Sequence, residues 1–166
     1  MFSWSASVRI LSQGKLFIFH LSVDNIPSII QSNYLSELNN KSQKHGHLQC
    51  ERLDYYYEAV KINVNITDFY LLLSYINFEA YSYLYEHNFD PYDSNRNLLS
   101  SDAIDDHSKV SRYRITRYLQ SNITYVLVIT TKHGHKNVQG EFAAIVYGSN
   151  EIHMKKIGMY MLLIFI

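Results

Sequence analysis

Apolar and polar residues alternate through much of the middle of the chain. Within 57–65, Val60, Ile62 and Val64 fall on one side of an extended backbone, and lysine and asparagine fall on the other. A period of two that includes β-branched residues predicts a strand with one buried face. The same pattern predicts strands at 80–86, 109–119 and 142–147, with a short strand around Leu98-Leu99.

Two further segments are apolar on both sides of the predicted strand. In 69–76, one side carries the four residues Phe69, Leu71, Leu73 and Tyr75. The other side of this segment carries Leu72 and Ile76, so both faces are largely apolar. The segment 123–131 contains the continuous apolar run Val126-Leu127-Val128-Ile129, which predicts a central strand that is covered on both faces.

Turn-forming residues separate these segments at short intervals. The polar stretches 87–108, which contains Pro91, and 132–140 are predicted to be loops. A helix over 29–38 is the one helical alternative, and no segment has the period of a long amphipathic helix. The pattern therefore predicts an all-β fold: an antiparallel β-sandwich, jelly-roll-like, with irregular N- and C-terminal appendages.

The two ends of the chain differ from its middle. In residues 1–33, Arg9 and Lys15 precede the apolar run 16–21, which has the outline of a secretory signal or of a remnant of an upstream domain. The tail 151–166 ends in an apolar run that is shorter than the ~20 residues of a membrane-spanning helix. We therefore expect an N-terminal appendage at 1–33, a β-sandwich domain at 34–150 and an apolar tail at 151–166.

Composition and charge narrow the class of protein. The 166 residues include 15 Lys and Arg and 15 Asp and Glu, so the formal net charge is zero. This balance argues against nucleic acid as the main partner, because phosphate binding requires a positive excess. Hydrophobic residues make up 47% of the chain, which is enough for a packed core. The single cysteine, Cys50, excludes an internal disulfide and leaves the compartment open.

Several short motifs follow one another between Tyr34 and Gly148. They are Tyr55-Tyr56-Tyr57-Glu58-Ala59-Val60, Tyr81-x-Tyr83-Leu84-Tyr85, Phe89-Asp90-Pro91, Asn97-Leu98-Leu99, Tyr113-x-Ile115-Thr116-x-Tyr118-Leu119, Tyr125-x-Leu127-Val128-x-Thr130-Thr131 and Gly140-x-Phe142. In this order they resemble the pre-peptidase C-terminal type of β-sandwich, in the form repeated in large animal extracellular proteins. The resemblance implies a non-catalytic, jelly-roll-like module in a secreted or cell-surface protein, which binds a protein or carbohydrate surface or spaces its neighbours.

The long acidic connection is the candidate metal site. It contains Asp90, Asp93, Asp102, Asp105 and Asp106, and Ca²⁺ takes about six to eight oxygen ligands that a single loop can supply. Of these, Asp102, Asp105 and Asp106 are the predicted Ca²⁺ ligands. The alternative is that these residues are ordinary turn formers, because their spacing matches no EF-hand.

Two His-x-His pairs offer a different metal chemistry. His45 and His47 form one pair, and His133 and His135 form the other. Imidazoles two residues apart on a strand share a face and can bind Zn²⁺ or Cu²⁺. The sequence places no third ligand beside either pair, so solvated loop histidines are the favoured interpretation. A small metal-dependent enzyme or metal-binding protein is the alternative function that they support.

Glycosylation sequons and tyrosines are the remaining surface candidates. The sequons begin at Asn40, Asn65 and Asn122, and all three are glycosylation candidates in a secreted protein. The tyrosines at 81, 83 and 85 share one side of a strand, where they form either an aromatic platform for a ligand or part of the core.

No catalytic motif organises the sequence. It contains no Gly-x-Ser-x-Gly elbow, no His-Glu-x-x-His and no phosphate-binding loop. We therefore expect a non-catalytic extracellular module for binding, adhesion or spacing, without a required cofactor and with Ca²⁺ as its candidate ion. The other alternative is a membrane-anchored receptor fragment that reaches the membrane through its C-terminal tail.

Overall fold

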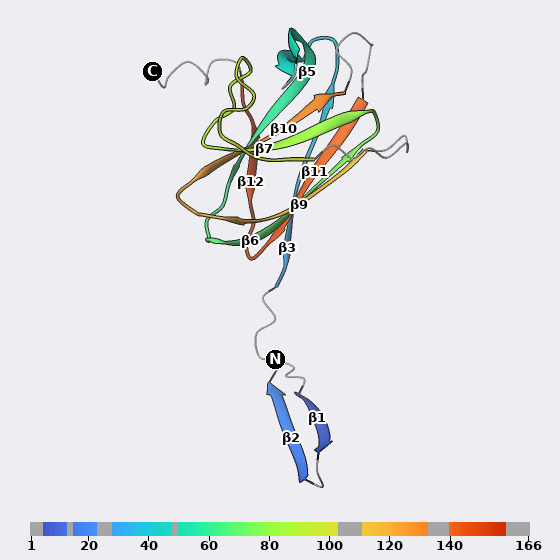
Figure 1. Cartoon of the computed structure of the whole chain (residues 1–166), viewed down its shortest axis with the longest axis vertical. Helices are drawn as coiled ribbons and strands as arrows, with labels where there is room; N and C mark the ends of the chain where they lie inside the picture. The colour runs from blue at the N-terminus through green and yellow to red at the C-terminus, as the bar shows by residue number, and fades with distance from the viewer. Residues whose placement is uncertain are drawn as a thin grey trace.

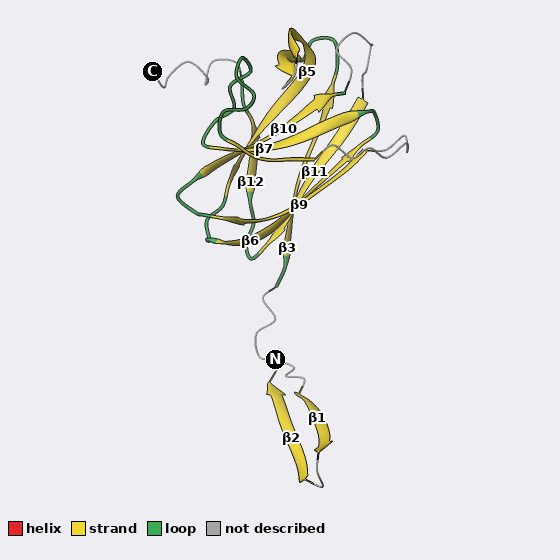
Figure 2. Ribbon diagram, in the orientation of Figure 1, coloured by secondary structure: helices red, strands yellow, loops and turns green. Residues whose placement is uncertain are grey.

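Strands provide all the regular secondary structure of the described residues (Figure 2). The computed structural model describes residues 5–12, 15–22, 28–47, 50–102, 111–132 and 140–158. The strands are β1 (Ser5–Ser12), β2 (Lys15–Ser22), β3 (Ile30–Leu38), β4 (Gln43–His47), β5 (Cys50–Asn63), β6 (Asp68–Ile76), β7 (Ala80–Glu86), β8 (Leu98–Asp102), β9 (Ser111–Leu119), β10 (Thr124–Thr131), β11 (Gly140–Gly148) and β12 (His153–Lys156).

Two antiparallel sheets form the body of the molecule (Figure 1). One has four strands in the order β3-β11-β6-β9. The other has six strands: β12-β5-β10-β7-β8 form its path, and β4 pairs with the N-terminal half of β5. Apart from the β4–β5 and β7–β8 hairpins, each step from β3 to β12 passes from one sheet to the other. This alternation confirms the predicted antiparallel, jelly-roll-like sandwich.

The main core lies between the two sheets. Alternate residues of each strand point into it, as the period of two predicts. Val60 and Ile62 of β5, and Val64 just after it, are buried there, as predicted, together with Tyr113 and Ile115 of β9. Residues on the inner face of β6, β7, β10 and β11 complete this core: Leu72, Ile76, Leu84, Leu127, Ile129, Phe142, Ala144 and Val146.

Tyr70 is a fully buried residue of the core, and its ring leaves room only for glycine at position 148. The Tyr70 hydroxyl donates to Ile66 O at 2.6 Å and contacts Asn150 Oδ1 at 2.7 Å. A Cβ atom on Gly148 would lie 2.1 Å from Tyr70 Cε1. The end of β11 therefore accepts no side chain at this position without displacement of the ring.

The flanking segments contribute more to the sandwich than the sequence indicates. Within 29–38, for which a helix is the alternative, residues 30–38 form β3, because β11 offers a complete ladder from Gly140–Leu38 to Gly148–Ile30. The helical alternative is therefore wrong. The sandwich includes residues 30–33 and His153–Lys156, which the sequence assigns to the two appendages. In the part of the chain that the structure describes, β1 and β2 pair only with each other.

Candidate functional site

The outer face of the six-stranded sheet is covered by the chain itself, and we call it the covered face. A second apolar cluster lies on this face, on the side of the sheet opposite the main core. Its buried members are Tyr57, Ala59, Tyr83, Tyr85, Phe89, Val126 and Val128. β10 is thus buried on both sides, which confirms the prediction made for the run 126–129.

Phe89 is the centre of this cover. Its ring centroid lies 4.9 Å from that of Tyr85, 5.2 Å from that of Tyr57 and 5.7 Å from that of His45. The connection from β7 to β8 is fixed over the sheet because Tyr85 Oη donates to Ser94 O at 3.0 Å. Tyr83 and Tyr85 are therefore core residues, and the alternative of an open tyrosine platform at 81, 83 and 85 is wrong for these two.

His45 is a buried member of the same face. Its Nε2 lies 2.8 Å from Thr130 Oγ1, and Thr130 donates its hydroxyl hydrogen to Tyr56 O at 3.0 Å. Because that hydrogen is committed, Nε2 carries the hydrogen of the His45–Thr130 bond and acts as the donor. His45 Nε2 is therefore engaged in a structural hydrogen bond. The side chain of His47, and all of His133 and His135, lie outside the described residues.

The outer face of the four-stranded sheet is exposed, and we call it the open face. β6 turns Tyr70, Leu72, Ser74 and Ile76 into the core, so its other apolar side points away from the sandwich. Phe69 is 65% exposed, Tyr75 is 43% exposed, and Leu71 and Leu73 are half-buried. On the flanking strands, Leu35 of β3 is 77% exposed and Tyr118 of β9 is 53% exposed.

The strand registers arrange the open face in cross-strand rows. One row reads Leu35, Ala143, Tyr75 and Arg112, from β3 through β11 and β6 to β9. The next rows read Asn33, Ile145, Leu73 and Arg114, and then Gln31, Tyr147, Leu71 and Thr116. In each row the two central positions, on β11 and β6, are apolar. The second and third rows are polar at both edges.

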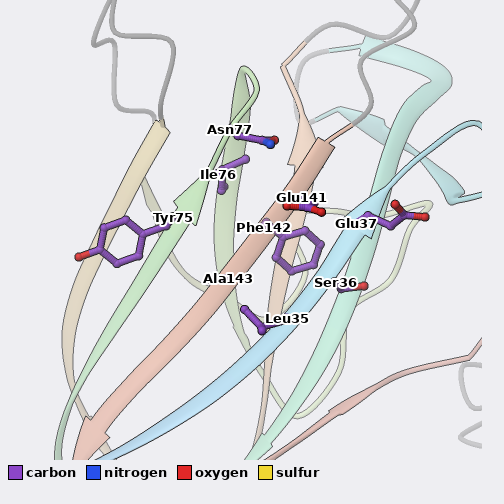
Figure 3. A pocket seen from close by; sticks show the side chains of 9 residues that line it. All are labelled: Leu35, Ser36, Glu37, Tyr75, Ile76, Asn77, Glu141, Phe142 and Ala143. Atoms are coloured by element: carbon purple, nitrogen blue, oxygen red, sulfur yellow. The ribbon is translucent and has the colours of Figure 1, made fainter.

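Two of the shallow grooves on the open face are lined partly by β11. The larger has a volume of about 570 Å³, and Ala143 lies between Leu35 and Tyr75 in its wall (Figure 3). At its other end are Glu37 and Glu141, which are exposed and directly opposite each other in the β3–β11 ladder. A smaller groove of about 380 Å³ includes Phe69 and Tyr147. Because the like charges of Glu37 and Glu141 are directly opposed, they repel, and this corner of the open face favours a positive partner.

One buried carboxylate lies between the sheets, away from either outer face. Glu58 of β5 is 2% exposed and accepts a hydrogen bond from Tyr34 Oη at 2.6 Å. Its second oxygen forms a salt bridge with Lys156 of β12. Burial, and then the Glu58 carboxylate, raise the pKa of Tyr34 far above its ordinary value, so Tyr34 remains a hydrogen-bond donor. Both carboxylate oxygens are thus engaged in joining β3, β5 and β12.

The side chains of the predicted Ca²⁺ ligands lie outside the part of the chain that the structure describes. Asp102 ends β8 and its side chain is not described, and Asp105 and Asp106 lie outside the described residues. Asp90 accepts a hydrogen bond from the Tyr92 amide at 2.9 Å, which is the turn-forming role of such residues. Within the described ranges, no cluster of three His, Cys, Asp or Glu residues is placed to hold a metal.

The three candidate glycosylation sites are exposed in turns at the ends of the sandwich. Asn40 lies between β3 and β4, Asn65 between β5 and β6, and Asn122 between β9 and β10. The turns of Asn65 and Asn122 are neighbours, because the Ser121 amide donates to Thr67 Oγ1 at 3.0 Å. None of the three residues belongs to a strand of the open face.

The alternation in the sequence groups Phe69, Leu71, Leu73 and Tyr75 on one side of a strand but assigns no role to them. A second signal is present in 142–147, where Ala143, Ile145 and Tyr147 also alternate with core residues. β6 and β11 are both apolar on the side that points away from the core, so the outer face of the four-stranded sheet is suited to being covered. Among the described residues, only the six-stranded sheet has such a cover on its outer face.

Comparison with known proteins adds no identity: no family model matches the chain, and no curated protein matches it. The described residues contain no helix that is both long enough and apolar enough to cross a membrane.

Proposed function

We propose that this chain is a non-catalytic binding module whose contact surface is the open face. The single observation that carries the proposal is the exposure of a continuous apolar surface, with Leu35 at 77%, Phe69 at 65% and Tyr118 at 53%. Soluble proteins seldom leave such surfaces uncovered unless they bind there. A polar edge around an apolar centre is also the usual anatomy of a protein–protein interface.

The setting that we propose for the module is extracellular. The sequence resemblance to the pre-peptidase C-terminal type of sandwich supports this setting, and so do three sequons in exposed turns. Glycans at Asn40, Asn65 or Asn122 would project from the ends of the sandwich and leave the open face accessible. Ca²⁺ binding through Asp102, Asp105 and Asp106 is a separate proposal, which a Ca²⁺-dependent rise in the unfolding midpoint would support.

Site-specific photo-crosslinking tests the open face as the contact surface. A photoreactive phenylalanine derivative replaces Tyr75 in the full chain, which is secreted by cultured animal cells and illuminated in their presence. The matched control carries the same group at Tyr92, which is 82% exposed in the connection from β7 to β8. We expect a discrete crosslinked macromolecule from position 75 and none from position 92. Equal labelling from both positions, or none from position 75, would contradict the proposal.

A further inference from the structure

The open face is complementary to itself, and this property rests on its proposed use as a contact surface. Two-fold axes relate the subunits of most homodimers. An axis parallel to the strands, lying over the boundary between β11 and β6, turns the strand order around. It therefore places β3 of one copy over β9 of the other, and β11 over β6. Each cross-strand row of one copy then faces the same row of the other copy, with the order of its four positions reversed.

Apolar positions meet apolar positions in this arrangement. Ile145 of one copy faces Leu73 of the other, and Tyr147 faces Leu71, because each pair shares a row. In the row of the larger groove, Ala143 faces Tyr75 of the second copy. A small residue opposite a large one allows two sheets to interdigitate at the ~10 Å separation of packed sheets. The groove beside Ala143 is thus a receptor for the Tyr75 ring of the other copy.

The edges also match in the two rows whose edge positions are polar. Asn33 of one copy faces Arg114 of the other, since both lie in the row of Ile145 and Leu73. Asn33 and Arg114 are both exposed in the single chain, so both can form new hydrogen bonds.

The size of the open face fits a dimer. β3, β6, β9 and β11 each have nine residues, which at ~3.4 Å per residue gives a length of about 30 Å. Four strands at ~4.8 Å spacing give a width of about 19 Å. The projected area is therefore roughly 600 Å², close to the ~800 Å² of accessible surface that each partner buries in a standard interface. Zero net charge also removes the long-range repulsion that opposes self-association.

We propose that the open face binds a second copy of this chain, with the two four-stranded sheets packed face to face about a two-fold axis parallel to their strands.

Sedimentation equilibrium of the full chain over about 1–100 µM, a range that populates a typical interface of this size, tests the proposal. We expect a mass of twice the 19.5 kDa of the chain. Ala143→Arg fills the groove that receives Tyr75 and should weaken the dimer at least about tenfold. The matched control, Tyr92→Arg, changes an exposed residue on the other side of the sandwich and should alter the dissociation constant less than about twofold. Circular dichroism establishes that both variants are folded.

A gain of affinity provides a second test that no folding defect can imitate. Asn33→Asp places a carboxylate opposite Arg114 of the other copy and should tighten the dimer about threefold to tenfold at low salt. Within one copy, two strands separate these positions, so the benefit requires the second copy. Adding Arg114→Gln should remove the gain, and raising the ionic strength should reduce it.

The outcomes separate this inference from the proposed function. A monomer at all concentrations, with a different macromolecule crosslinked at position 75, would overturn the dimer and retain the binding module. A dimer that Ala143→Arg leaves intact would overturn the face-to-face geometry and assign association to another part of the chain. A dimer that Ala143→Arg breaks and Asn33→Asp tightens supports both proposals.

Discussion

β10 and β6 carry the same sequence signature and reach opposite environments. Both strands are apolar on both sides, and both lie in the interior of their sheets. The outer side of β10 is buried beneath the connection that contains Phe89, whereas the outer side of β6 leaves Phe69 65% exposed. An apolar pattern on both sides of a strand therefore indicates that the strand can be buried on both faces. Whether it is buried on both faces depends on the rest of the chain.

The connections in the two sheets account for this difference. The connection from β7 to β8 is long enough to return over its own sheet, and Tyr85 holds it there through Ser94 O. The connections around β6 are short turns between the sheets at 64–67 and 77–79, and neither crosses the four-stranded sheet. The outer face of the four-stranded sheet is therefore the one that the described residues leave exposed.

The same substitution made on both faces is the strongest test of whether the two faces differ in burial. Phe89→Ala removes a ring that is 1% exposed and packed against three other rings, so we expect a loss of about 3–5 kcal/mol in unfolding free energy. Phe69→Ala removes the same ring from the open face, where Tyr118 is its ring neighbour at 5.2 Å, and we expect a loss below about 1 kcal/mol. Urea unfolding of both variants measures the two losses.

That pair of variants also has an outcome that would contradict the comparison. If Phe69→Ala destabilises the chain as much as Phe89→Ala at low concentration, the open face must be covered within a single copy. If the loss for Phe69→Ala grows with protein concentration, the face is covered by association, as mass action requires.

Alkaline pH should weaken the packing of the covered face. Burial, followed by nearby charged groups, raises the pKa of Tyr57 and of Tyr83 from 10.0 to about 12. The folded state thus holds these protons more tightly than the unfolded chain, so their contribution is fully present below pH 10 and is lost as the pH rises toward 12. Each buried tyrosine contributes a slope of up to about 1.4 kcal/mol per pH unit in that window.

Urea unfolding at a series of pH values above 8 measures this slope. Tyr83→Phe removes one titrating group and should flatten the slope by up to one proton equivalent. An unchanged slope in Tyr83→Phe would mean that Tyr83 ionises without unfolding, and the covered face would then be open to solvent on that side.

The sandwich was predictable from the sequence because its evidence is local. Val60, Ile62 and Val64 alternate with polar residues, and the pattern assigns their burial without any knowledge of neighbours. The continuous run from Val126 to Ile129 likewise indicates a doubly buried strand. The strand at 30–38 was not predicted, because the sequence offered only a helix there and the pairing with β11 joins residues that are far apart in the sequence.

The orientation of β6 and the identity of the candidate site were not predictable in the same way. Either side of β6 is apolar enough for the core, and the choice depends on Tyr70, whose ring needs the space beside Gly148 and the acceptor Ile66 O. These contacts join residues that are far apart in the sequence or that meet only at a turn. The path of the connection from β7 to β8 determines which outer face stays exposed. The path of a loop cannot be predicted from hydrophobic periodicity, because a loop has no regular repeat.

The smallest expected effect concerns the residue that starts this loop. His87 has a φ of 67°, in the left-handed region, and its amide donates to Thr124 O at 2.7 Å. A β-branched side chain is strongly disfavoured there, so His87→Val should lower the unfolding free energy by about 1–2 kcal/mol. His87→Gly fits the same backbone and should stay within about 0.5 kcal/mol of the parent chain.

The matched control is Thr116→Val on β9, where the extended backbone of the open face favours a β-branched residue. Urea unfolding of the three variants distinguishes a backbone effect from a general effect of valine. If His87→Val and Thr116→Val are equally harmless, the turn at His87 does not fix the loop, and the difference between the two faces must come from Phe89 and its ring contacts alone.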